Sequence, residues 1–125
     1  MGNPNAFYQE AFVYELIDPR DNSPFYIGAT VDPEQRLRKH VSRSKRAKNG
    51  HFDLTQRRIQ DIVNSCNRVE MCVLEAIKNV TGRALAQRET YWIHYRWYID
   101  GVRLTNIRSG NSEILDEYMR KHRTA

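Results

Sequence analysis

The sequence predicts an α+β domain in which a small, mostly antiparallel sheet of about three strands is flanked by helices. Two strand-like segments are separated by a loop rich in turn-forming residues, and a helical pattern begins shortly after the second segment. A third strand-like segment follows two predicted helices. The chain of 125 residues is long enough for one domain with a single sizeable core.

The first two strands each carry a tyrosine. Residues 11–17 have a strand-like pattern and residues 25–30 are read as the return strand. Two prolines in the loop between them indicate a hairpin with a long turn. Tyr14 and Tyr26 fall on neighbouring strands and can share one face, although periodicity alone does not fix the register. Gly28 costs stability inside a strand, so we expect another group to approach its backbone closely.

A helix is predicted to begin at Pro33, which suits the first turn after a cap at Asp32 or Thr30. Leu37 and Val41 are one turn apart and are expected to face the core. Beside them lies a stripe of polar and basic residues, namely Arg36, Lys39, His40 and Arg43.

The remaining elements follow the same patterns. Residues 54–65 predict a second helix, and residues 68–77, which become continuously apolar, predict a central strand. Residues 103–107 are expected to form a short edge strand that carries Asn106, and residues 113–121 a last amphipathic helix. Three regions are therefore expected: a loosely held N-terminus at 1–10, one domain at 11–108 and a helical appendage at 109–125.

The longest predicted helix runs from Gly82 to about Tyr98 and contains one unusual carboxylate. Glu89 falls inside the apolar arc of this helix. The other members of that arc are Leu85, Ala86, Trp92 and Ile93. A carboxylate in such a stripe is costly unless it is paired or binds a metal ion. It is therefore either a salt-bridge partner of Arg36, Arg88 or Arg96, or a functional group.

Composition restricts the class of protein. The net charge of +5 is compatible with a polyanionic partner but does not require one. No apolar run is long enough for a membrane span and no secretory signal is visible, so we expect a cytoplasmic protein, or a nuclear one in a eukaryote. Cys66 and Cys72 either pair or, as the simpler reading, are reduced and mostly buried thiols. With His51 they lack the paired spacings of zinc sites.

Basic residues are concentrated in one part of the chain. Between Arg36 and Arg58 lie nine Lys or Arg residues and a single acid, Asp53. Such a run is either an ordinary solvated surface or a footprint for a nucleic-acid backbone. The candidate nucleic-acid-binding residues are Arg38, Lys39, Arg43, Lys45, Arg46, Lys48 and Arg57. Arg36 and His40, one helical turn apart, are placed to contact a single phosphate from one side.

Taken in order, these segments resemble the GIY-YIG nuclease superfamily over residues 11–108. The resemblance is carried by Val13-Tyr14-Glu15, Tyr26-Ile27-Gly28, Arg36 with His40, Glu89 before Trp92-Ile93, and Asn106. One position departs from the pattern: Phe12 begins the first motif, where the name of the family implies glycine. The resemblance implies a divalent-metal-dependent endonuclease that hydrolyses phosphodiester bonds in DNA, either duplex or branched.

The resemblance also implies roles for individual residues. Glu89 would hold a single Mg²⁺ or Mn²⁺ ion, and Arg36 would stabilise charge on the phosphate. Tyr14 would activate the water, with His40 either as the acceptor of its proton or as the base itself. Tyr26 would position the phosphate or water, Asn106 would support the site, and His51 is a minor candidate.

Two other interpretations remain open. The chain is either a catalytically weak module with this fold that only binds nucleic acid, or an interaction protein whose basic face is incidental. The apolar stripe of residues 113–121 permits a homodimer through the C-terminal helix, or it covers the chain's own core.

Overall fold

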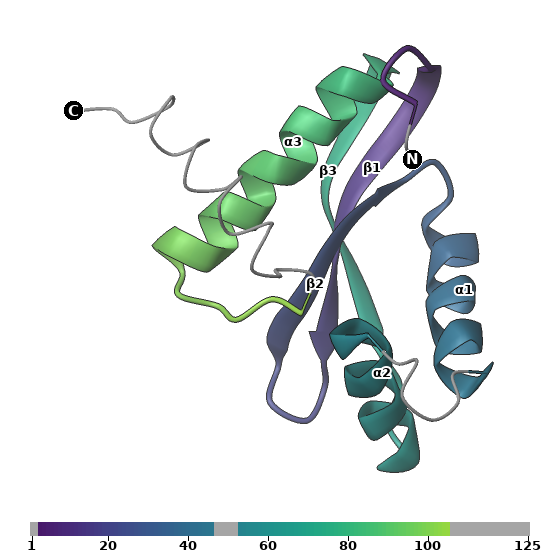
Figure 1. Ribbon diagram of the computed structural model, residues 1–125, viewed down its shortest axis with the longest axis vertical. Coiled ribbons are helices and arrows are strands. Elements are labelled where there is room, and N and C mark those ends of the chain that lie inside the picture. The colour runs from purple at the N-terminus through teal and green to yellow at the C-terminus, as the bar shows by residue number, and fades with distance from the viewer. Residues whose placement is uncertain (1–2, 47–52, 106–125) are drawn as a thin grey trace.

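The computed structural model describes residues 3–46 and 53–105 and has the expected α+β architecture. Three antiparallel strands form one sheet in the order β2–β1–β3 (Figure 1), and these are β1 (Phe7–Asp18), β2 (Ser23–Thr30) and β3 (Glu70–Thr81). The helices in chain order are α1 (Pro33–Arg46), α2 (Leu54–Asn64), α3 (Gly82–His94) and the π-helical turn η1 (Tyr95–Ile99). None of the helices within the described ranges is long and apolar enough to cross a membrane.

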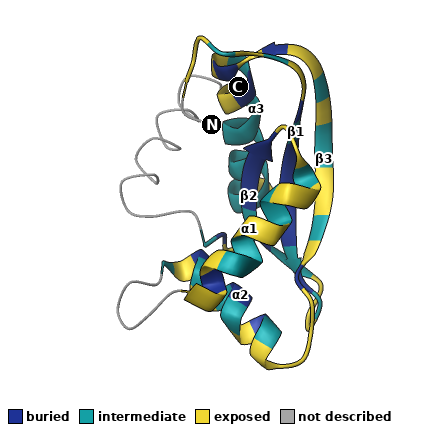
Figure 2. Ribbon diagram, turned by 90° about the vertical axis from the view of Figure 1, so that its right-hand side faces the viewer, coloured by how far each residue is buried: buried dark blue, intermediate teal, exposed yellow. Residues whose placement is uncertain are grey.

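The central strand β1 separates two hydrophobic cores. On one face, Val13 packs in a cluster that includes Leu85 of α3. On the other face, Tyr14 packs with Ile59 and Ile62 of α2. This is the arrangement that alternation along a strand produces, because successive side chains point to opposite faces of the sheet. Figure 2 shows β2 and part of β1 as buried, with β3 exposed along much of its length.

The prediction that the third strand is central was wrong, since β3 lies at one edge and pairs only with β1 among the described residues. Its apolar run has a different cause. Val13 pairs with Glu75, whereas Tyr14 pairs with Val73, so Leu74 is an extra residue in a bulge. The run of successive apolar residues in β3 therefore arises because the bulge changes the sheet face to which the side chains point. It does not mean that both faces of β3 are buried, since Val73 is 44% exposed.

The N-terminal segment is more ordered than the sequence suggested. Strand β1 begins at Phe7, four residues before the predicted start. The preceding residues close the start of α3, since the Ala6 and Pro4 carbonyls accept hydrogen bonds from the backbone N–H groups of Gly82 and Arg83, at 2.8 and 3.0 Å. Residues 3–10 are therefore part of the packed domain and not a loose extension.

Three smaller expectations also need correction. Ala86 is exposed, and it is Ala84 that packs against the hydrophobic cluster around Leu85. Cys66 and Cys72 are both exposed and unpaired rather than buried. Residues 103–105 do not form a strand. The predicted helix at 113–121 lies outside the described residues.

Candidate active site

The two predicted tyrosines meet over a glycine. Tyr14 on β1 is the cross-strand neighbour of Gly28 on β2. A Cβ atom added at Gly28 would lie 2.5 Å from the Tyr14 hydroxyl oxygen and 2.9 Å from Cε1 of Tyr26. The close approach expected at Gly28 is therefore confirmed, and the group that approaches is the Tyr14 ring. Any larger residue at this position would displace the phenol.

Helix α1 brings a histidine to the same point. The helix begins at Pro33, and the Asp32 carboxylate accepts a hydrogen bond of 3.1 Å from the Gln35 backbone N–H, as an N-terminal cap does. This start places His40 two turns into the helix. Its Nε2 atom lies 2.7 Å from the Tyr14 hydroxyl oxygen, and its ring packs edge-on against Tyr26 with centroids 4.9 Å apart.

Burial decides the protonation states of this pair. Burial, together with the charges of Arg36 and Arg43, lowers the pKa of His40 to about 4. The pKa of Tyr14 is raised by burial and by the neighbouring Tyr26. At neutral pH, His40 is therefore uncharged and Tyr14 keeps its proton. The 2.7 Å contact is then a hydrogen bond between two neutral groups, with Nε2 as acceptor when the histidine proton is on Nδ1.

Glu89 forms no salt bridge with the arginines that lie close to it in sequence, Arg88 and Arg96. The Arg88 guanidinium binds Glu75 on β3 at 2.8 Å, and the Arg96 guanidinium binds Glu15 on β1 at 2.9 Å. Within the described ranges no salt bridge to Glu89 exists, so the structural alternative considered for this carboxylate is not realised. Burial raises the pKa of Glu89, and the positive charge of Arg36 is among those that oppose this.

Arg36 connects the members of the site electrostatically. Its positive charge lowers the pKa values of Tyr14, Tyr26, His40 and Glu89. Glu89 in turn raises the pKa values of both tyrosines. Charged and titratable side chains from β1, β2, α1 and α3 therefore act on one another's pKa values. In Figure 1, α1 and α3 lie on either side of β2.

Asp53 is a neighbour of the site that the sequence interpretation did not single out. Its carboxylate caps α2 by accepting a 2.7 Å hydrogen bond from the Gln56 backbone N–H. The same negative charge raises the pKa values of His40 and Tyr26. The available signal was its position as the single acid in the basic run.

The residues present are compatible with one hard divalent cation. The half-buried carboxylate of Glu89 supplies an oxygen ligand of the kind that Mg²⁺ and Mn²⁺ prefer. Among the described residues, no group of three or more His, Cys, Asp or Glu side chains gathers around a common point. An ion held by Glu89 would therefore take its other ligands from water and from a substrate phosphate.

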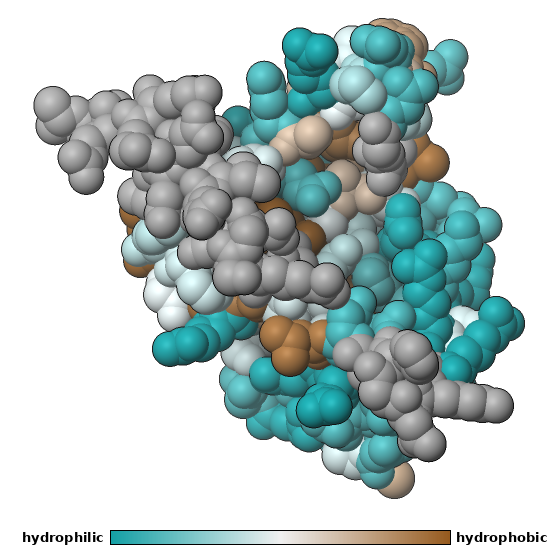
Figure 3. All heavy atoms as spheres, viewed as in Figure 1, coloured by the Kyte–Doolittle hydropathy of each residue, from teal (hydrophilic) through white to brown (hydrophobic). Residues whose placement is uncertain are grey.

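The basic run does not form one surface. Lys39, Arg43 and Arg46 lie on the same side of α1 as Arg36, whereas Arg38 and Lys45 are about half a turn away. All five of these flanking residues are exposed, as is Arg57 on α2. Hydrophilic side chains dominate the surface over α1 in Figure 3. Lys48, His51 and Asn106 lie outside the described residues.

Comparison with known proteins agrees with this arrangement. A family model described as the GIY-YIG catalytic domain matches residues 10–96. No curated protein and no solved structure matches the chain.

Proposed function

The chain belongs to the GIY-YIG family, whose catalytic domain is of the nuclease type, and from this premise we propose that it is a divalent-metal-dependent endonuclease acting on DNA. The observation that carries the proposal is a half-buried Glu89 that forms no salt bridge within residues 3–46 and 53–105 and whose charge acts on Tyr14, the hydrogen-bond partner of His40. A fold that needed Glu89 only for stability would pair it with a cation, as this fold pairs Asp18, Glu15 and Glu75 with arginines.

Tyr14 and His40 together supply a path for the proton of the attacking water. Tyr14 is a poor base by itself, because it keeps its own proton at neutral pH. When its hydroxyl oxygen takes a proton from water, its own proton passes to Nε2 of His40 across the 2.7 Å hydrogen bond. The water becomes the nucleophile, Tyr14 is unchanged and His40 carries the proton.

Substrate binding makes His40 a better proton acceptor. In the free protein, Arg36 and Arg43 help to lower its pKa to about 4. A phosphate bound between these cations offsets their charge and so raises the proton affinity of the imidazole. The base is thereby strengthened only when the substrate is in place.

Arg36 and the flanking cations hold the phosphate. Arg36 forms no ion pair among the described residues, so its planar donors are available to phosphoryl oxygens. Lys39, Arg43 and Arg46 on the same side of α1 extend this contact along the DNA backbone. Tyr26 supports the ring of His40, and Asn106 is proposed to support the site from outside the described residues.

A cation bound at Glu89 would polarise the phosphoryl group and stabilise charge on the leaving oxygen. The chain itself would supply the Glu89 carboxylate as a ligand, and the burial of this carboxylate would strengthen its attraction for a cation.

The test is cleavage of supercoiled plasmid with Mg²⁺, Mn²⁺ or EDTA. The wild-type chain should cleave only with metal, and Glu89→Gln should lower the rate by at least about 1,000-fold. Glu70→Gln is the matched control, because Glu70 is exposed on β3, at the edge of the sheet away from β2. Salt-dependent DNA binding without cleavage in any metal would instead establish a module that only binds nucleic acid.

A further inference from the structure

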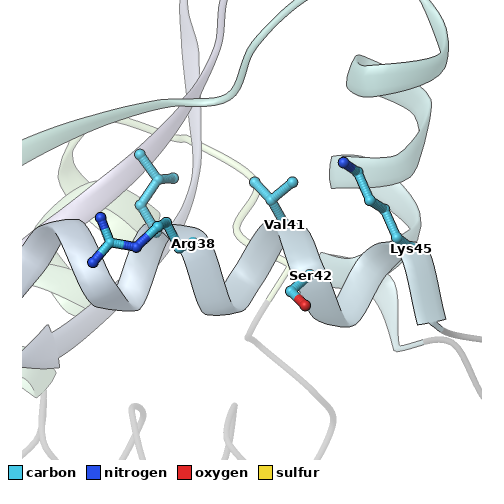
Figure 4. A pocket seen from close by; sticks show the side chains of 5 residues that line it. Arg38, Val41, Ser42 and Lys45 are labelled. Atoms are coloured by element: carbon cyan, nitrogen blue, oxygen red, sulfur yellow. The ribbon is translucent and has the colours of Figure 1, made fainter.

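A shallow hollow of about 320 Å³ lies along α1, on a different side of the helix from Arg36. Leu37 and Val41 form its apolar part, while Arg38, Ser42 and Lys45 form its polar part. Figure 4 shows Arg38 and Lys45 at the two ends of this row, with Val41 and Ser42 between them. The hollow therefore combines an apolar strip with a positive charge at each end.

The two cations of the hollow are not used by the site. Arg38 and Lys45 lie about half a turn from Arg36 around the helix axis, so they cannot grip a phosphate together with it. Neither forms an ion pair with an acid of the described residues. Two exposed, unpaired cations beside apolar side chains favour an occupant that is both acidic and apolar.

The chain contains such a segment in its C-terminal part, outside the described residues. Residues 113–119 carry three acids, Glu113, Asp116 and Glu117. Their apolar side chains recur at helical spacing at Ile114, Leu115, Tyr118 and Met119. We propose that residues 113–119 bind the hollow on α1 of the same chain, with the apolar side chains on Leu37 and Val41 and the acids opposite Arg38 and Lys45.

The path of the chain toward this segment supports intramolecular binding. The Thr105 backbone N–H donates a 2.6 Å hydrogen bond to the Phe25 carbonyl oxygen, and its hydroxyl lies 2.8 Å from that of Thr55 on α2. Helix α2 packs on α1. The seven residues from 106 to 112 can span about 25 Å. A tether of that length keeps the segment at an effective concentration in the millimolar range.

The proposal separates the basic run into two functions and does not depend on nuclease activity. Lys39, Arg43 and Arg46 face the side of Arg36, while Arg38 and Lys45 recognise the chain itself. Neutralising Arg38 and Lys45 should accordingly leave the salt dependence of DNA binding nearly unchanged, whereas neutralising Lys39 and Arg43 should flatten it.

Disulfide cross-linking in the full chain tests the contact. In a Cys66→Ser, Cys72→Ser background, Ser42→Cys with Met119→Cys should form an intrachain disulfide on mild oxidation, seen as a faster-migrating monomer on a non-reducing gel. The control pair, Lys39→Cys with Met119→Cys, places the first cysteine on the other side of α1 and should form at least about tenfold less of it.

Charge reversal gives a second measurement on the same cross-link. Arg38→Glu with Lys45→Glu should lower its yield several-fold, and adding Glu113→Lys, Asp116→Lys and Glu117→Lys should restore it. Equal yields in test and control pairs, or a yield insensitive to charge reversal, would overturn the proposal. Disulfides formed between chains would also overturn it, because the occupant would then be a second copy.

Discussion

Four carboxylates of the described residues that are at least half-buried, Asp18, Glu15, Glu75 and Glu89, differ in their partners. Asp18, Glu15 and Glu75 each bind an arginine of another element or of the adjacent turn. Glu89 is also largely shielded from water, but it forms no salt bridge with an arginine of the described part of the chain. The pKa of Asp18 is lowered by its hydrogen bonds to Arg20, and that of Glu89 is raised by burial. The carboxylates that stabilise the structure are therefore paired with arginines. Glu89, which is expected to bind a ligand, is not.

After the loss of cleavage expected for Glu89→Gln, the next largest effect on the rate concerns Tyr14. Tyr14→Phe removes the hydroxyl that connects water to His40 and should lower the cleavage rate by at least about 100-fold. The stability should fall by only about 1 kcal/mol, since one hydrogen bond is lost and the ring remains packed. Single-turnover cleavage and urea unfolding measure the two effects. A rate within a few-fold of wild type would remove Tyr14 from the mechanism.

The pH dependence of stability tests the neutral state of His40. Its pKa is 6.5 when unperturbed and about 4 in the folded chain, so the unfolded state binds a proton first as the pH falls. Stability is fully present above pH 6.5 and should decline between pH 6.5 and 4 by about 1.4 kcal/mol per pH unit from this residue. Urea unfolding of wild type and His40→Gln isolates the contribution. An identical pH dependence in the two chains would refute a neutral, buried imidazole.

Among the carboxylates that pair with arginines, Asp18 offers the clearest test, and Asp18→Asn should destabilise the fold. The Asp18 side chain is 2% exposed and binds both Arg20 and Arg58, each at 2.8 Å, which links the hairpin to α2. Both arginines are about one-third exposed, so the loss should be about 2 kcal/mol rather than the larger cost of a fully buried pair. Cleavage by the folded fraction should be unaffected. A midpoint of urea unfolding equal to that of wild type would show that this network does not stabilise the chain.

Local signals in the sequence were sufficient to predict where helices begin and where the tyrosines lie. Pro33 with its cap at Asp32 and Thr81 before α3 are short-range features that act on adjacent backbone groups. Tyr14 and Tyr26 were placed on neighbouring strands because a hairpin needs only its two strands and its turn.

Long-range choices were not predictable in the same way. The bulge at Leu74 changes the face of β3 without a sequence mark, so an edge strand looked like a central one. Arg88 and Arg96 were sequence neighbours that appeared able to pair with Glu89. They bind Glu75 and Glu15 instead, 13 and 81 residues away. Such partner choices follow from tertiary packing, which periodicity does not contain.

The most direct test of the central claim is the free energy of unfolding of Glu89→Gln, measured in urea at neutral pH without divalent metal. If the carboxylate is uncompensated, removing its charge relieves the cost of burial, so Glu89→Gln should be more stable than wild type. The exposed control Glu70→Gln should not change the stability. A loss of stability in Glu89→Gln would contradict the account, because it would mean that Glu89 is held by a structural partner.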